Sequence, residues 1–98
     1  MPTKKRTTFS RFDAAEYLGS DEDIAAYLTA TAEADDPALM VAALGDVARA
    51  RNMTLLAEQT GMTRMGLYKA LSGHGNPSYA TVAKVAHALG LKIVVRPA

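Results

Sequence analysis

The sequence predicts an all-α fold: a four- to five-helix domain with N-terminal helices and a short C-terminal β-strand. Three observations lead to this prediction. Of the 98 residues, 49% are hydrophobic, enough for a packed core along most of the chain. Alanine is frequent, Phe and Tyr are few and Trp is absent, a composition that favours closely packed helices over a sheet sandwich. Apolar residues recur at helical spacing between clear helix start and stop signals.

Two helices are expected in the N-terminal third. Asp13 and Glu16 have capping-box spacing, which predicts a short helix that ends at Gly19. Ser20 then caps a second helix over residues 21–34, with its acids on the side opposite its apolar residues. The apolar positions of this helix are Ile24, Tyr27, Leu28 and Thr31 or Ala32.

A third helix is predicted at the "DDP" motif. Asp36 caps it, Pro37 occupies its first position, and the helix runs to residue 52. Arg49 and Arg51 lie in its last turn, where the helix dipole favours cations. The buried face is predicted to hold Met40, Leu44, Val47 and Ala48.

The segment "MTLLAEQTGMTRMGLYKALSG" predicts two short helices joined by a turn. Asn52 or Thr54 caps the first helix, Gly61 makes the turn, and Thr63 caps the second helix. The buried stripe of the second helix is predicted to be Leu67, Ala70 and Leu71. The opposite side carries Arg64, Met65, Tyr68, Lys69 and Ser72, with Gly66 near its edge.

The remaining chain predicts a loop, a helix and a strand. Residues 73–78 form the loop, and a helix follows over 79–90. A β-branched run predicts a strand over 91–98. Because a lone strand is not stable, it should pair with a twofold mate, which we favour, or with the N-terminal "TTFSRF". The residues assigned to homodimerisation are Ile93, Val94 and Val95.

The charge of the chain is divided into three parts. Residues 1–12 carry +4, residues 13–37 carry −8 without a single base, and residues 38–98 carry +5. This asymmetry indicates two partners of opposite charge. The alternative is that the acids gather only because helix N-termini favour negative charge.

Several functions are excluded by what the sequence lacks. Without cysteine there are no disulfides and no thiolate metal sites. No apolar run approaches the ~20 residues that span a membrane, and no apolar stretch follows the basic N-terminus to make a signal peptide. We expect a soluble, cytoplasmic protein with no membrane partner. Without a catalytic motif, a phosphate-binding loop or a ligand cluster, we expect no enzyme activity, no cofactor, no metal and no small-molecule substrate.

A register of small, apolar and turn residues extends through the C-terminal two thirds of the chain. It reads Leu56-Ala57-x3-Gly61-x-Thr63-x3-Leu67-x3-Leu71-x-Gly73, then Asn76-Pro77-x3-Thr81, then Ala88-Leu89-Gly90. This register resembles the helix-turn-helix of phage-repressor (XRE) type over residues 38–90. The resemblance implies that the two short helices form a DNA-reading pair.

A narrower resemblance covers nearly the whole chain. It rests on "FDAAEYL", "IAAYL", "DPALMVAALGDVARARNMTLLAEQTGMTR", "LYKALS" and "GNPSYATVAKVAHALGLK". These segments resemble the addiction-module antidote proteins, the HigA-like antitoxins. The resemblance implies the antitoxin of a type II toxin–antitoxin module, which neutralises a RelE/ParE-like toxin and represses its own operon. The alternative is a stand-alone regulator of phage-repressor type, whose N-terminal helices only pack on the domain or mediate dimerisation.

These resemblances divide the chain into three parts. Residues 1–37 hold the basic arm and the acidic N-terminal helices, a candidate segment for toxin binding or packing. Residues 38–90 form the helix-turn-helix domain that binds double-stranded operator DNA, and residues 91–98 form the C-terminal strand.

The candidate DNA-binding residues follow from the docking of such a helix in the major groove. Arg64 suits a bidentate contact to guanine, and Lys69 suits a phosphate or a base. Tyr68 can bind a phosphate or contact a thymine methyl group. Gly66 either lets the backbone approach the sugar-phosphate wall closely or is a tolerated defect. The full candidate set is Thr54, Thr63, Arg64, Met65, Gly66, Tyr68, Lys69, Asn76, Ser78, Tyr79 and Thr81.

The candidate toxin-binding residues lie in the acidic segment. A ribonuclease toxin holds RNA phosphates, so its surface should be basic and complementary to these carboxylates. Phe12 and Tyr17 are the expected apolar anchors. Tyr27 and Leu28 can belong to the core instead, since they share a face with Ile24. The candidate set is Phe12, Asp13, Glu16, Tyr17, Asp21, Glu22 and Asp23.

Overall fold

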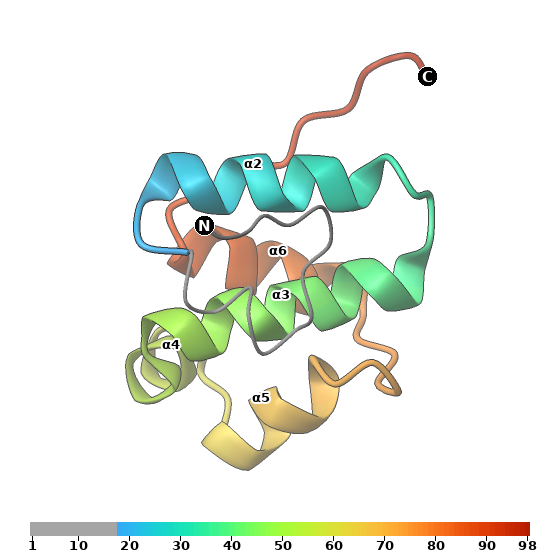
Figure 1. The fold of residues 1–98 in the computed structure, drawn as a ribbon. Helices are drawn as coiled ribbons and strands as arrows, with labels where there is room; N and C mark the ends of the chain where they lie inside the picture. Colours follow the sequence, from blue (N-terminus) through green and yellow to red (C-terminus); the bar gives the residue numbers. More distant parts are fainter. Residues whose placement is uncertain (1–17) are drawn as a thin grey trace, which may run out of the picture.

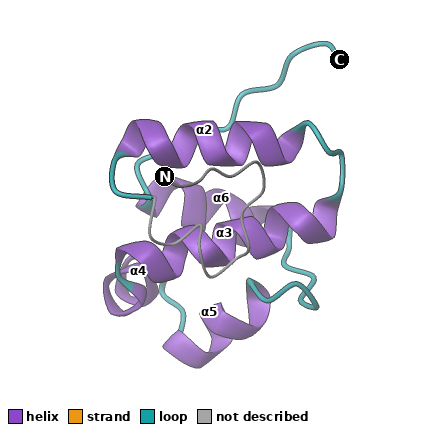
Figure 2. Cartoon of the chain, viewed as in Figure 1, coloured by secondary structure: helices purple, strands orange, loops and turns teal. Residues whose placement is uncertain are grey.

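The computed structural model describes residues 18–98, and this part of the chain is helical and contains no strand (Figures 1 and 2). The all-α prediction is therefore confirmed for these residues. The short helix expected at Asp13 lies outside the described residues, apart from its last position, Leu18. No helix in the described range has the length and apolar character needed to cross a membrane. The helices are α2 (Asp21–Ala32), α3 (Pro37–Arg51), α4 (Met53–Thr60), α5 (Arg64–Ala70) and α6 (Tyr79–Ala88).

Each helix in residues 18–98 follows a polar side chain that accepts a hydrogen bond from a backbone N–H group in the first turn. At α4 this residue is Asn52 and not Thr54, because the Asn52 side chain accepts from the Leu55 N–H at 3.0 Å. Helix α2 ends two residues earlier than predicted, and Asp35 takes the left-handed φ of 53° that turns the chain toward α3. The five N-caps are Ser20, Asp36, Asn52, Thr63 and Ser78.

The core lies where all five helices meet (Figure 1). Helix α2 lies along α3, and α4 packs against α3, α5 and α6. Helical periodicity predicts most of the inward positions correctly, although Met40 and Ala70 are only half-buried and Ala32, the alternative to Thr31, is exposed. The buried cluster draws at least one side chain from each helix: Ile24, Leu44, Val47, Leu56, Leu67 and Val85.

Helix α2 is fastened to α3 by apolar and polar contacts. Ile24 is fully buried, and Tyr27 and Leu28 are half-buried against the core cluster. The Tyr27 hydroxyl donates a hydrogen bond to Asp46 Oδ2 at 3.0 Å. Tyr27 and Leu28 therefore belong to the core, as expected from the face that they share with Ile24.

Helix α3 approaches the end of α5 so closely that Gly45 is required. A Cβ atom built on Gly45 would lie 2.4 Å from the backbone oxygen of Leu71. Because a backbone carbonyl cannot rotate away as a flexible side chain does, any larger residue must push the two helices apart. Gly45 therefore sets how deeply α5 sits on the body of the protein.

The predicted C-terminal strand over residues 91–98 is wrong. A strand needs a neighbour for its backbone hydrogen bonds, and no other strand occurs among the described residues. Gly90 turns the chain out of α6 with a φ of 79°, and the segment then runs past α2 without regular structure (Figure 1). Its apolar side chains remain exposed, 71% for Val94 and 90% for Val95.

Candidate functional site

Helix α5 is held from one side and presents the other to solvent. Leu67 and Leu71 anchor it in the core, as the predicted stripe requires. The exposed side carries two cations, an aromatic ring and a long apolar side chain. This combination suits a negatively charged ligand that also exposes apolar groups. These exposed residues are Arg64, Met65, Tyr68 and Lys69.

The start of α5 explains its unusual glycine. Thr63 Oγ1 accepts the Gly66 N–H at 2.9 Å, which caps the helix. A Cβ atom on Gly66 would lie 3.0 Å from that same oxygen, tighter than an ordinary contact. The glycine therefore keeps the cap uncrowded, a local reason that neither interpretation of the sequence included.

Two exposed side chains of α5 contact each other one turn apart. The Arg64 guanidinium carbon lies 5.9 Å from the centre of the Tyr68 ring, within the range of a cation–π interaction. This contact restricts the Arg64 side chain before any ligand arrives. A restricted arginine loses less conformational entropy on binding a ligand than a freely rotating one.

A shallow hollow of about 430 Å³ lies beside the last turn of α5. Tyr68 and Lys69 line it together with Ser72, His74 and Gly75 from the following loop. Ser72 fastens this loop, because its hydroxyl donates to the Lys69 carbonyl at 3.0 Å and accepts from the His74 N–H at 3.3 Å. The candidate DNA-binding set omits Ser72 and His74, although helical spacing places Ser72 on the exposed side of this helix.

The start of α6 holds a second group of candidate residues. Ser78 caps α6, and its hydroxyl donates to Thr81 Oγ1 at 3.2 Å while it accepts from the Thr81 N–H at 3.1 Å. Asn76 and Tyr79 are exposed. None of these four lines the hollow beside α5. Thr54, on the exposed side of α4, likewise does not line it, and of the candidate DNA-binding residues only Tyr68 and Lys69 do.

The acidic segment is described only in part. Asp21, Glu22 and Asp23 form the first turn of α2 and are all exposed. Asp21 pairs with Arg51, which ties this turn to the end of α3. The other four toxin-binding candidates lie outside the described residues: Phe12, Asp13, Glu16 and Tyr17.

The described residues define a small all-α protein with a cationic helix on one surface and an acidic helix start on another. The chain belongs to the family of probable addiction module antidote proteins, whose model matches residues 8–97. It is 53% identical over 85 residues to an uncharacterized protein of Haemophilus influenzae, an overlap of 87% of this chain and 88% of that protein. No solved structure shows a significant match. Membership in an antidote family implies a toxin partner in general terms.

Proposed function

We propose that this chain is the antitoxin of a type II toxin–antitoxin module. It binds and neutralises a basic RelE/ParE-like toxin, and it represses its own operon through a helix-turn-helix formed by α4 and α5. The observation that carries the DNA-binding half is the exposed row on α5, a short helix that the core anchors by Leu67 and Leu71. Family membership supports the antitoxin half.

The connection between α4 and α5 supports the helix-turn-helix. Gly61 ends α4 with a φ of 75°, and two residues later Thr63 caps α5. The turn is therefore short and rigid, which keeps α5 at a constant angle to α4. The N-terminal turn of a recognition helix reaches base edges, and Arg64 occupies that turn.

The first prediction concerns the recognition helix. Arg64→Ala is expected to weaken binding to the operator by about 1–3 kcal/mol and to relax specificity at one base position. Lys69→Ala should weaken binding to all DNA sequences more evenly. It should also lower the slope of log affinity against log salt concentration by about one unit. Fluorescence anisotropy with DNA from upstream of the gene, at fixed salt and in a salt series, measures both.

The control for this prediction is Lys84→Ala, which removes an exposed cation from α6 outside the candidate set. It should leave operator affinity nearly unchanged. An Arg64→Ala protein with the affinity of the wild type would show that α5 does not enter the groove.

Repression by a helix-turn-helix protein commonly needs two recognition helices. We propose a homodimer that forms through Ile93, Val94 and Val95, which are exposed in the described chain. Its two α5 helices then read half-sites about 34 Å apart, or a multiple of that distance.

The toxin-binding half rests on the exposed carboxylates at the start of α2. Removing the whole N-terminal segment does not test it cleanly, because Ile24 belongs to the core and Tyr27 is hydrogen-bonded to Asp46. Charge reversal at exposed positions avoids this damage. Glu22 and Asp23 are suitable positions, since both side chains are exposed.

The second prediction follows from that choice. Glu22→Lys combined with Asp23→Lys is expected to slow association with the basic protein encoded beside this chain by about tenfold at low salt, because charged surfaces steer encounter. Surface plasmon resonance measures the association rate, and a growth-rescue assay measures neutralisation. Raising the salt should narrow the difference between variant and wild type.

The control for charge reversal is Glu33→Lys, which changes an exposed carboxylate at the opposite end of α2. If this control slows association as much as a single Glu22→Lys change, the effect comes from net charge and not from the acidic helix start. If neither variant affects the toxin and operator binding stays intact, the stand-alone regulator is the better interpretation.

A further inference from the structure

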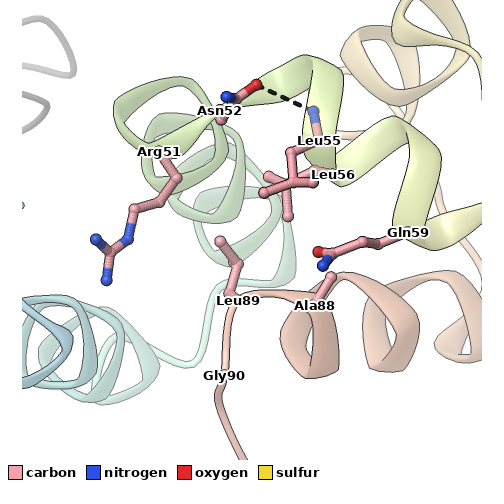
Figure 3. A pocket seen from close by; sticks show the side chains of 8 residues that line it. All are labelled: Arg51, Asn52, Leu55, Leu56, Gln59, Ala88, Leu89 and Gly90. Carbon is pink, nitrogen blue, oxygen red and sulfur yellow. Dashed lines mark hydrogen bonds between the residues drawn. The ribbon is translucent and has the colours of Figure 1, made fainter.

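A second hollow, of about 290 Å³, lies where α4 begins and α6 ends (Figure 3). Leu55, Leu56 and Gln59 line it from α4, and Ala88 and Leu89 line it from the end of α6. In Figure 3 the Leu56 and Leu89 side chains extend between the two helices, with Leu55 beside them. The hollow is therefore mainly apolar.

Leu55 makes this hollow unusual. It is 47% exposed, although its neighbour Leu56 is buried in the core. The Leu55 N–H donates to the Asn52 cap, so the start of α4 is well ordered around it (Figure 3). An exposed leucine at the edge of an apolar hollow favours a partner that brings an apolar side chain.

The C-terminal segment of the same chain lies elsewhere. Gly90 lines the hollow and then turns the chain away with its φ of 79°. Val94 and Val95 instead lie beside the other half of α2, where they line a separate hollow with Thr29 and Ala32. Within one molecule the exposed apolar run and the apolar hollow therefore remain apart.

The charges around the run and the hollow are complementary. Lys92 and Arg96 flank the run and are exposed. Near the hollow, Asp21 is paired with Arg51, which is itself a lining residue, and Glu58 lies one turn after Leu55 on α4. Because Asp21 neutralises Arg51, the remaining charge beside Leu55 is the carboxylate of Glu58, which favours an apolar segment flanked by basic residues.

We propose that this hollow is the docking site for residues Ile93–Val95 of a second copy of the chain. In a twofold dimer each copy inserts its run into the hollow of the other, so both contacts form together. The inference rests on the proposed homodimer and deepens it, because it names the surface that receives the C-terminal segment.

Cross-linking tests the contact directly, because the chain contains no cysteine. A Leu55→Cys chain is mixed with a tagged Val94→Cys chain, and the disulfide between them is identified by its mass after mild oxidation. Leu39→Cys is the matched control, since Leu39 is 46% exposed on α3 and lies outside the hollow. We expect the Leu55–Val94 cross-link to form about tenfold faster or more, because docking raises the effective concentration of the two thiols.

A second variant tests the energetics. Leu55→Asp is expected to raise the dimer dissociation constant about tenfold or more, because it places a carboxylate against an apolar run. Leu39→Asp should leave the constant nearly unchanged. Sedimentation equilibrium measures the constant, and circular dichroism checks that both variants are folded.

The outcomes separate this inference from the proposals on which it rests. A dimer in which the Leu55–Val94 cross-link is no faster than the Leu39 control overturns the inference and leaves the homodimer intact. A wild-type chain that binds its operator as a monomer overturns both the docking inference and the proposed homodimer. If Leu55→Asp stays dimeric but loses the toxin, the occupant of the hollow is the toxin and the inference is wrong.

Discussion

Leu67→Ala is expected to lower the free energy of unfolding by about 2–5 kcal/mol, the range for removing a buried leucine side chain. Leu67 is 0% exposed and belongs to the central cluster. Helix α5 has only seven residues, too few to be stable in isolation, so it depends on this anchor. The same change should therefore also weaken operator binding, because it loosens the helix that presents Arg64.

Urea denaturation followed by circular dichroism measures this loss of stability. Met65→Ala is the matched control, since it shortens a large apolar side chain on the same helix that is 73% exposed. We expect the control to change stability by less than about 0.5 kcal/mol. Equal losses for the two variants would contradict the anchoring role of Leu67.

The second large loss of stability is expected on substitution of Asp46. This residue of α3 is 1% exposed, and its carboxylate faces α2. Its Oδ2 accepts the Tyr27 hydroxyl at 3.0 Å, and its Oδ1 lies 2.5 Å from Arg49 Nη2. Asp46→Ala should lower the free energy of unfolding by about 2–3 kcal/mol, because Tyr27 and Arg49 both lose an acceptor in a poorly solvated place. The loss is smaller than for a fully buried ion pair, because the Arg49 side chain is 35% exposed and can bind water.

A double-mutant cycle measures the contact between Tyr27 and Asp46. Tyr27→Phe alone should lower the free energy of unfolding by about 0.5–1.5 kcal/mol, the usual contribution of one hydrogen bond. In the Asp46→Ala background the same change should cost less, because its acceptor is gone. Asp21→Ala, which breaks the exposed pair with Arg51, is the control and should cost much less than Asp46→Ala. Additive losses for Tyr27 and Asp46 would show that their contact does not stabilise the protein.

This network matters for function because it holds α2 in place. Tyr27 lies on α2 and Asp46 on α3, so their hydrogen bond joins the acidic helix to the proposed DNA-binding body. Gly45, the residue before Asp46, contacts the end of α5 at the Leu71 carbonyl. One turn of α3 therefore contacts both elements on which the proposed function depends.

The two proposed surfaces differ in how well the sequence predicts them. The exposed row of α5 follows from helical spacing alone, and the structure places each of those side chains in solvent. Ser72 is predicted on this exposed side, but the hollow that Ser72 and His74 line beside α5 is not predicted, because it depends on how the loop folds back on the helix. That α5 binds DNA and that α2 binds a toxin stay predictions.

Local signals in the sequence specify where the helices begin and which faces they bury. Caps such as Ser20, Asp36 and Thr63 act on backbone groups within three residues, and burial follows a period of 3.6 residues, so both signals are local. Other features depend on contacts between helices that are distant in the sequence. Residues 91–98 form no strand because a strand needs a distant partner, and Gly45 is required only because α5 lies against α3. Such contacts join residues far apart in the chain, and no local pattern encodes them.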